Sequence, residues 1–210
     1  MISIILILFI PYLINIGNFR LLLYDPSFYH DEFQKVLSYE RQPDAEKLLG
    51  NLLQFIKGRE ALSSDFNERE VSHMHDVRAV IRGFLYVMYA MLILYIILLW
   101  IMIKRFKVSI EKIMYLNAGG GVLTILLLLF LYIATLNFSI VFDRFHTVFF
   151  NAESWVFPAQ SLLIQLFPQQ FFLDFTYTIV IRSMVSALFL MIVGVLTYIY
   201  FNSYVQKSHS

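Results

Sequence analysis

The sequence contains no cysteine. This excludes a thiol nucleophile, a disulfide framework and a thiolate metal site within the 210 residues. Charge is also scarce: charged residues make up 15% of the chain, the net charge is +1 at neutral pH, and no basic stripe suggests nucleic-acid binding. Apolar residues dominate instead, at 59%, which is typical of a membrane protein.

Four apolar stretches meet or approach the roughly 20 residues that a helix needs to cross a bilayer: residues 2–18, 79–103, 113–137 and 177–200. We therefore predict an all-α, polytopic membrane protein with four transmembrane helices, folded as one domain over residues 1–210. The first stretch is short and contains Pro11, so a signal peptide is the alternative. It lacks a basic leading region and a small-residue cleavage site, which favours a retained helix.

Charge in the short loops predicts the orientation of these spans. Residues 104–112 include four basic residues and one acidic residue: Lys104, Arg105, Lys107, Lys112 and Glu111. Because basic loops stay in the cytoplasm, we expect this loop and both chain ends inside the cell. The long loops, about residues 18–77 and 138–176, are then extracytoplasmic.

The first long loop predicts a helix of its own. Asp44 is a plausible N-cap and Gly58 a stop signal. Between them, apolar residues recur at helical spacing: Leu48, Leu49, Leu52, Leu53 and Ile56. Because such an apolar face needs a cover, we expect an extracytoplasmic helical cap over the bundle.

A second helix start lies just before the second span. Asn67 and Glu70 have the spacing of a capping box, so that span should begin as a helix that projects outward. On this helix His73 and Asp76 share one face, whereas His75 points to nearly the opposite side. We therefore assign His75 to the exposed side.

The second long loop is rich in aromatic residues. Between residues 145 and 175 these are Phe145, Phe149, Phe150, Trp155, Phe157, Phe167, Phe171, Phe172 and Phe175. Pro158 and Pro168 interrupt the segment too often for it to span, which predicts an aromatic loop in the membrane interface. Composition leaves open whether these rings pack and anchor the loop or form a wall that binds lipid.

Two histidine–carboxylate pairs offer proton-transfer chemistry. His73 with Asp76, and His146 with Asp143, are three residues apart and fall on the predicted outer side. A nearby carboxylate orients an imidazole and favours its charged form, as a general base requires. A metal site is less expected, because His-x-His diverges on a helix and no His-Glu-x-x-His occurs. No Gly-x-Ser-x-Gly motif supports a serine hydrolase.

Arg82 and Arg182 each lie inside the outer end of a predicted span. An ionised group at that depth is costly unless it snorkels or pairs. Snorkelling to headgroups and facing the bundle both remain open. Arg182 is the better candidate for an inward role, because Ser183 and Ser186 make its helix locally polar.

Two long motifs resemble those of a known family. They are residues 67–78 (NEREVSHMHDVR) and residues 145–151 (FHTVFFN), the latter followed by Trp155, Phe157 and residues 163–172 (LIQLFPQQFF). Together with residues 25–29 (DPSFY), they are similar to the bacterial lipoprotein intramolecular transacylases, which also have four spans. Two departures are modest: the chain begins almost directly in the first span, and His75 occupies a position that we take to be variable.

The resemblance implies an acyltransferase that acts on diacylglyceryl-modified bacterial lipoproteins in the cell membrane. Such an enzyme moves the sn-2 acyl chain to the α-amino group of the N-terminal cysteine and gives the lyso form. Because nucleophile and ester belong to one substrate, the reaction needs orientation and proton transfer but no cofactor or metal.

On this hypothesis His73 and His146 transfer protons and Asp76 positions His73. Arg182, or backbone amides near Asn151, would contact the oxyanion. Four aromatic residues would form the wall of the acyl groove: Phe149, Phe150, Trp155 and Phe157. The sequence leaves open whether a histidine carries the acyl group transiently during the transfer.

Two other functions remain as alternatives. A metal-dependent membrane hydrolase would use the same histidines. A non-catalytic scaffold or transporter subunit would have no need of them.

Overall fold

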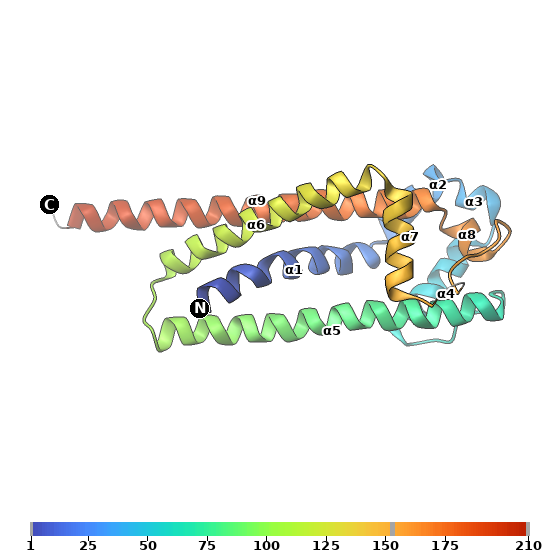
Figure 1. The fold of residues 1–210 in the computed structure, drawn as a ribbon, viewed down its shortest axis with the longest axis horizontal. Coiled ribbons are helices and arrows are strands. Elements are labelled where there is room, and N and C mark those ends of the chain that lie inside the picture. Colours follow the sequence, from blue (N-terminus) through green and yellow to red (C-terminus); the bar gives the residue numbers. More distant parts are fainter. Residues whose placement is uncertain (1, 152–153, 209–210) are drawn as a thin grey trace. The chain divides into compact units, whose positions relative to one another are not determined.

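A computed structural model describes residues 2–151 and 154–208, and the regular structure within these residues is helical (Figure 1). The described chain divides into two compact units. The membrane unit comprises the chain up to Arg20, Leu85–Ile133 and the chain from Thr178 onward. The histidine unit comprises Leu21–Phe84 and Ala134–Tyr177.

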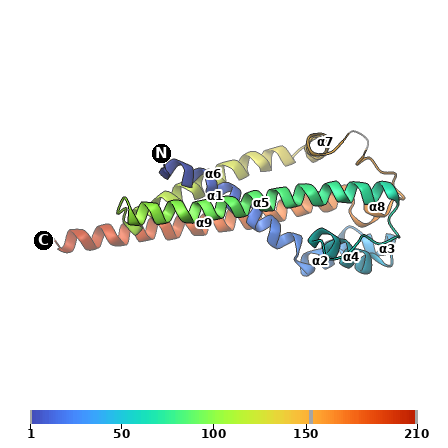
Figure 2. The same cartoon turned by 90° about the horizontal axis from the view of Figure 1, so that it is seen from below.

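Four helices are long and apolar enough to cross a membrane: α1 (Ile2–Leu23), α5 (Glu68–Lys104), α6 (Ile110–Thr135) and α9 (Gln169–Ser208). The predicted set of four spans is confirmed. Figure 2 shows α5 and α9 as single unbroken helices. Both begin before the apolar stretch that they contain, because a capping box starts α5 and α9 starts directly after Pro168.

Close packing holds the membrane unit together. Added Cβ atoms at Gly120 and Gly194 would collide with Ile10 on α1 and with the Met114 carbonyl on α6. Gly194 therefore lets the backbones of α9 and α6 approach closely, as in many membrane bundles, and Gly120 leaves room for the Ile10 side chain. Two hydrogen bonds also join helices here: Tyr95 Oη to Asn117 Oδ1 (2.6 Å) and Asn18 Nδ2 to Ser186 Oγ (3.3 Å).

The histidine unit contains the shorter helices: α2 (Pro26–Lys35), α3 (Ser38–Arg41), α4 (Ala45–Lys57), α7 (Phe138–Phe149) and α8 (Leu162–Leu166). The helix predicted between Asp44 and Gly58 is α4. Gly58 ends it in the left-handed region (φ 79°), as predicted. Asp44 occupies the N-cap position, as predicted, although its side chain makes no capping hydrogen bond.

Residues 138–176 were predicted to be a loop, but the structure shows that they contain α7, α8 and the first turns of α9. In the first long loop, α2 was also missed, although Asp25 caps it through hydrogen bonds from the Ser27 and Phe28 amides and Pro26 follows the cap. Both features are standard helix-start signals.

Many of the aromatic residues form a core inside the histidine unit. Rings from α2 and from the start of α9 pack against one another: Phe28, Tyr29 and Phe33 with Phe167, Phe171 and Phe175. An ion pair joins the same helices, with Lys35 Nζ 2.7 Å from Asp174 Oδ2. For these rings the packing interpretation is correct, and they are not available as a lipid wall.

Candidate active site

The structure brings His73 and His146 together within the histidine unit. Their ring centroids are 6.3 Å apart and their planes differ by 22°. His73 comes from α5 and is 8% exposed, whereas His146 comes from α7 and is half-buried. The two histidines that the sequence assigned to proton transfer therefore come together from separate segments of the chain.

The capping box places His73. The Asn67 amide donates to Glu70 Oε2 (2.9 Å), and the Glu70 amide donates to Asn67 Oδ1 (3.0 Å), as predicted. Glu70 does more than this, because its Oε1 accepts a hydrogen bond from the Leu163 amide (3.1 Å). This buried carboxylate thus ties α5, one turn before His73, to α8.

His146 is oriented by the main chain. Its Nδ1 lies 2.7 Å from the Phe142 carbonyl oxygen, one turn earlier on α7. Because a carbonyl only accepts, Nδ1 carries the hydrogen and the neutral ring leaves its lone pair on Nε2. His146 is therefore held in the tautomer that a general base acting through Nε2 requires.

Aromatic side chains surround the two imidazoles. Phe150 contacts both, with ring centroids 4.9 Å from His73 and 5.4 Å from His146. Phe157 packs on His73 (5.5 Å) and Trp155 on His146 (4.7 Å). Three of the four residues predicted to form the acyl groove thus touch the histidines.

The fourth, Phe149, lies one ring further away. It packs against Phe84 and Phe145 and is 40% exposed.

Burial keeps both histidines neutral near pH 7. It lowers the pKa of His73 to about 4, and the proximity of His146 lowers it further, whereas the charge of Asp76 raises it. Burial also lowers the pKa of His146, against the opposing effects of the Phe142 carbonyl and Asp143. Both groups lie outside the apolar spans. A proton on one ring makes protonation of the other less favourable.

Among the described residues no hydrogen bond joins either carboxylate to its histidine, so the expected orienting bond is not observed. Both carboxylates do raise the pKa of their histidine, as expected. His73 Nδ1 is buried without a hydrogen-bond partner among the described residues. Asp76 acts on His73 through its charge. For His146 the main-chain carbonyl of Phe142 takes the orienting role that the pattern assigned to Asp143.

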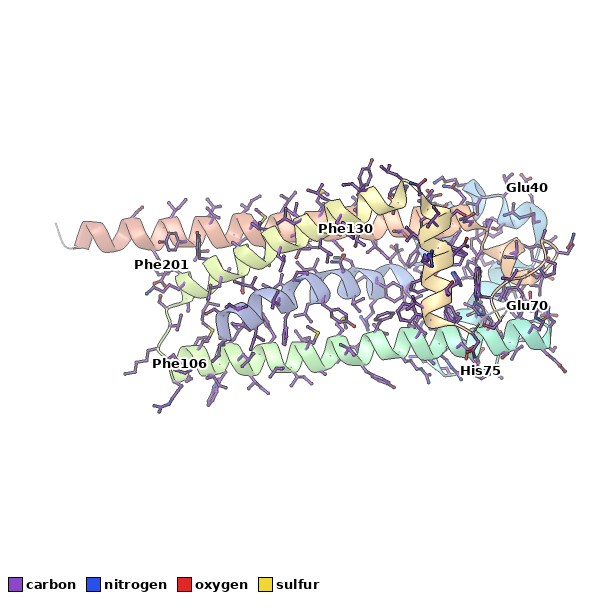
Figure 3. All side chains as sticks on the ribbon, viewed as in Figure 1. Glu40, Glu70, His75, Phe106, Phe130 and Phe201 are labelled. Carbon is purple, nitrogen blue, oxygen red and sulfur yellow. The ribbon has the colours of Figure 1, made fainter. Side chains whose placement is uncertain are left out.

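His75 is exposed, as predicted. It packs edge-on against Phe55 of α4, and its Nδ1 lies 3.0 Å from an Arg78 nitrogen. Figure 3 shows Glu70 and His75 on different sides of α5.

Arg82 reaches the C-terminal end of α4. Its guanidinium group lies against Gly58, where an added Cβ would collide with it. Arg78 donates a hydrogen bond to the Phe55 carbonyl at the same end of α4. Cations are favoured at a helix C-terminus, so these two arginines stabilise the end of α4.

Arg182 belongs to α9 in the membrane unit. The Arg182 carbonyl accepts a hydrogen bond from Ser186 Oγ (2.9 Å), which in turn accepts one from Asn18. The helix is thus locally polar, as expected, and the contact of Arg182 with an oxyanion stays a prediction.

The backbone near Asn151 is partly engaged. The Phe150 amide donates to the His146 carbonyl (2.9 Å), so it is not free to bind an oxyanion. The Asn151 carbonyl accepts hydrogen bonds from the amide and hydroxyl of Ser154. Asn151 itself is exposed.

Metal-ligating side chains do not gather here. Across residues 2–151 and 154–208, no three His, Asp or Glu side chains come together in a way that would hold a metal ion.

A family model described as the lipoprotein intramolecular transacylase Lit matches residues 1–172, which include both histidines and their aromatic neighbours. The chain belongs to this family. An uncharacterized protein of Aquifex aeolicus (strain VF5) is 33% identical over 132 residues, or 62% of this chain. The match spans 57% of that relative's length.

Solved structures of the lipoprotein intramolecular transacylase Lit from Bacillus cereus share the fold of this Lit-family chain. One superposes with a TM-score of 0.77 at 20% identity and covers 99% of this chain and 96% of that one. A variant of the same protein with a histidine replaced by alanine gives a TM-score of 0.75, again at 20% identity, with 99% and 94% covered. The match and the four apolar helices agree on a multi-pass membrane protein.

Proposed function

We propose that this chain is a lipoprotein intramolecular transacylase that acts on diacylglyceryl-modified bacterial lipoproteins. It moves the sn-2 acyl chain of the diacylglyceryl group to the α-amino group of the N-terminal cysteine. The observation that carries the proposal is the pair of neutral imidazoles, 6.3 Å apart, in an aromatic surround. Family membership supports the same reaction class.

The reaction balances without a co-reactant. A bond forms between the amine nitrogen and the acyl carbon, the bond from that carbon to the glycerol oxygen breaks, and one proton passes from nitrogen to oxygen. The α-amino group has an ordinary pKa of about 8, so the ammonium form first releases a proton to solvent, and the transfer starts from the neutral amine. The chain therefore has to orient one substrate molecule and move one proton.

His146 is the better base of the pair. Its Nε2 carries the lone pair, and the Nδ1 hydrogen bond to the Phe142 carbonyl stabilises the imidazolium that forms. His146 takes the amine proton and returns it to the glycerol oxygen. His73 stays neutral while His146 is charged, because the two charges repel each other, and its ring N–H is a donor for the oxyanion.

The neighbouring residues have supporting roles. Phe150, Trp155 and Phe157 border the acyl chain and exclude water, which favours attack by the amine over hydrolysis. Phe149 extends this wall. Asp76 tunes the pKa of His73 through its charge. Arg182 and the region of Asn151 are further candidate contacts for the oxyanion.

We also propose an orientation for the chain in the membrane. The basic loop at residues 104–112 favours a cytoplasmic position for that loop and for both chain ends. The histidine pair is then extracytoplasmic.

A substrate with two different acyl chains tests the proposal. A diacylglyceryl lipopeptide with distinct sn-1 and sn-2 chains is incubated with the purified protein and analysed by tandem mass spectrometry. We expect a product of unchanged mass that carries the sn-2 chain on nitrogen. Release of free fatty acid, or an sn-1 chain on nitrogen, would contradict the proposed transfer.

A further inference from the structure

The side chains of helix α7 form three stripes along its surface. One stripe is half-buried and packs inside the histidine unit: Phe138, Phe142 and His146. A second stripe is polar and exposed: Ser139, Asp143 and Thr147. A third stripe is apolar and exposed: Val141, Phe145 and Val148. At about 100° per residue, the polar and apolar stripes fall on nearly opposite sides of the helix, and the packed stripe lies between them.

The apolar stripe is costly in water. Val148 is 74% exposed, Phe145 43% and Val141 36%, and α7 contains no fully buried residue. A short helix with one apolar and one polar side is the pattern of helices that lie along a membrane surface. Ile140 and Arg144 occupy the side opposite the packed stripe and belong to neither exposed stripe.

Sequence continuity identifies what covers the apolar stripe. Only Leu136 and Asn137 separate α7 from α6, which is long and apolar enough to span a membrane. Exposed apolar side chains continue along the chain through this junction to the first residue of the apolar stripe: Phe130, Ile133, Leu136 and Val141. Exposed apolar side chains thus follow one another along the chain from a membrane-spanning helix into α7, which indicates lipid as the cover of the apolar stripe.

We propose that α7 lies along the membrane surface with Val141, Phe145 and Val148 in contact with lipid acyl chains. The polar stripe then faces water. The packed stripe, which ends in His146, then lies at a depth between the apolar stripe in lipid and the polar stripe in water. That level is the boundary of hydrocarbon and headgroups, where the esters of a glycerolipid also lie.

The position of α7 has a consequence for chemistry, which rests on the proposed function. A diacylglyceryl group in the bilayer has its sn-2 ester at the boundary depth. His146 meets that ester without lifting the acyl chains out of the membrane. On this account α7 sets the depth of the base, and the substrate approaches along the lipid surface.

The absence of cysteine makes a direct test simple, because each single cysteine is the only one in the chain. Val148→Cys and Thr147→Cys are adjacent on α7 but belong to opposite stripes. Each variant is labelled with a nitroxide and placed in phosphatidylcholine liposomes. Accessibility to oxygen, which concentrates in lipid, is compared with accessibility to a water-soluble nickel chelate by power-saturation electron paramagnetic resonance.

We expect the label at residue 148 to respond several-fold more to oxygen than to the chelate, and the label at residue 147 to show the reverse. Val141→Cys provides a second position in the apolar stripe if the Val148 variant does not fold. Equal responses at 147 and 148 would overturn the proposal. So would spin–spin broadening at 148 that disappears on dilution with unlabelled protein, because a second copy would then cover the stripe. The accessibilities do not depend on turnover, so a failed transacylase assay leaves them informative.

Discussion

His146 Nδ1 donates a hydrogen bond to the carbonyl oxygen of Phe142, four residues earlier on the same helix. The bond depends on α7 being helical at that point, since only then does the carbonyl of residue 142 reach residue 146. It fixes which nitrogen of the ring is basic and leaves Nε2 for the substrate.

The pH dependence of the reaction should report His146. Burial lowers the pKa of His146 from its ordinary value of 6.5, so the neutral ring predominates above that pH. We expect kcat/KM to fall below about pH 8 as the substrate amine becomes protonated. His146 then adds a second inflection, below pH 6.5. Asp143→Asn should move this second inflection further to acid, because the charge of Asp143 raises the pKa. Asp31→Asn is the exposed control on α2 and should leave the inflection in place.

Glu70 should be required for stability. Its two carboxylate oxygens accept hydrogen bonds from the amides of Asn67 and Leu163. A glutamine has only one acceptor oxygen, so Glu70→Gln leaves one amide without its partner and costs about 1–3 kcal/mol. Thermal unfolding in detergent should show a lower Tm, whereas the exposed Glu68→Gln in the same turn should not. Equal melting of the two variants would show that the Leu163 contact contributes little.

Glu32 should make the protein less stable at alkaline pH. Burial, together with Asp174, raises its pKa to about 7, above the ordinary 4.5 of an unfolded chain. The folded state therefore binds a proton more tightly, and this stabilisation is complete below pH 4.5 and lost as the pH rises through 7. Glu32→Gln mimics the protonated form and should melt higher than the native chain at pH 8, with little gain at pH 5. A Tm difference that is the same at both pH values would be inconsistent with a buried protonated carboxyl.

Gly194 should be irreplaceable in the membrane unit. A Cβ there would collide with the Met114 carbonyl and approach Ala118, whereas a Cβ at Gly17 would meet nothing within 4 Å. Gly194→Ala should therefore lower the Tm by several degrees, since backbone atoms cannot move aside cheaply. Gly17→Ala is the matched control in α1. If the two variants melt alike, α6 and α9 do not pack at Gly194.

Local signals in the sequence were sufficient for much of this fold. Length and apolar content give the four spans, Asn67 with Glu70 gives the start of α5, and Gly58 gives the end of α4. The helical period separates His73 from His75. Each of these features depends on residues within a few turns of one another.

Contacts between distant segments were not predictable in the same way. The Leu163 amide reaches Glu70 across 93 positions, and Lys35 pairs with Asp174 although nothing in either segment specifies the other. The i, i+3 pattern suggested that carboxylates orient both histidines. For His146 the main chain does so, because the Phe142 carbonyl, one helical turn earlier, lies within hydrogen-bond distance of Nδ1.

The central claim is that His73 and His146 act together in acyl transfer, and three single variants test it most directly. His73→Ala, His146→Ala and His75→Ala are purified and incubated with a diacylglyceryl lipopeptide, and the N-acylated product is measured by mass spectrometry. We expect product formation to fall by at least about 100-fold for the first two variants, because each loses a proton-transfer group. His75→Ala, on the exposed side of the same helix, should retain most of the activity. Near-native product formation by His73→Ala or His146→Ala, with the fold intact, would contradict the account.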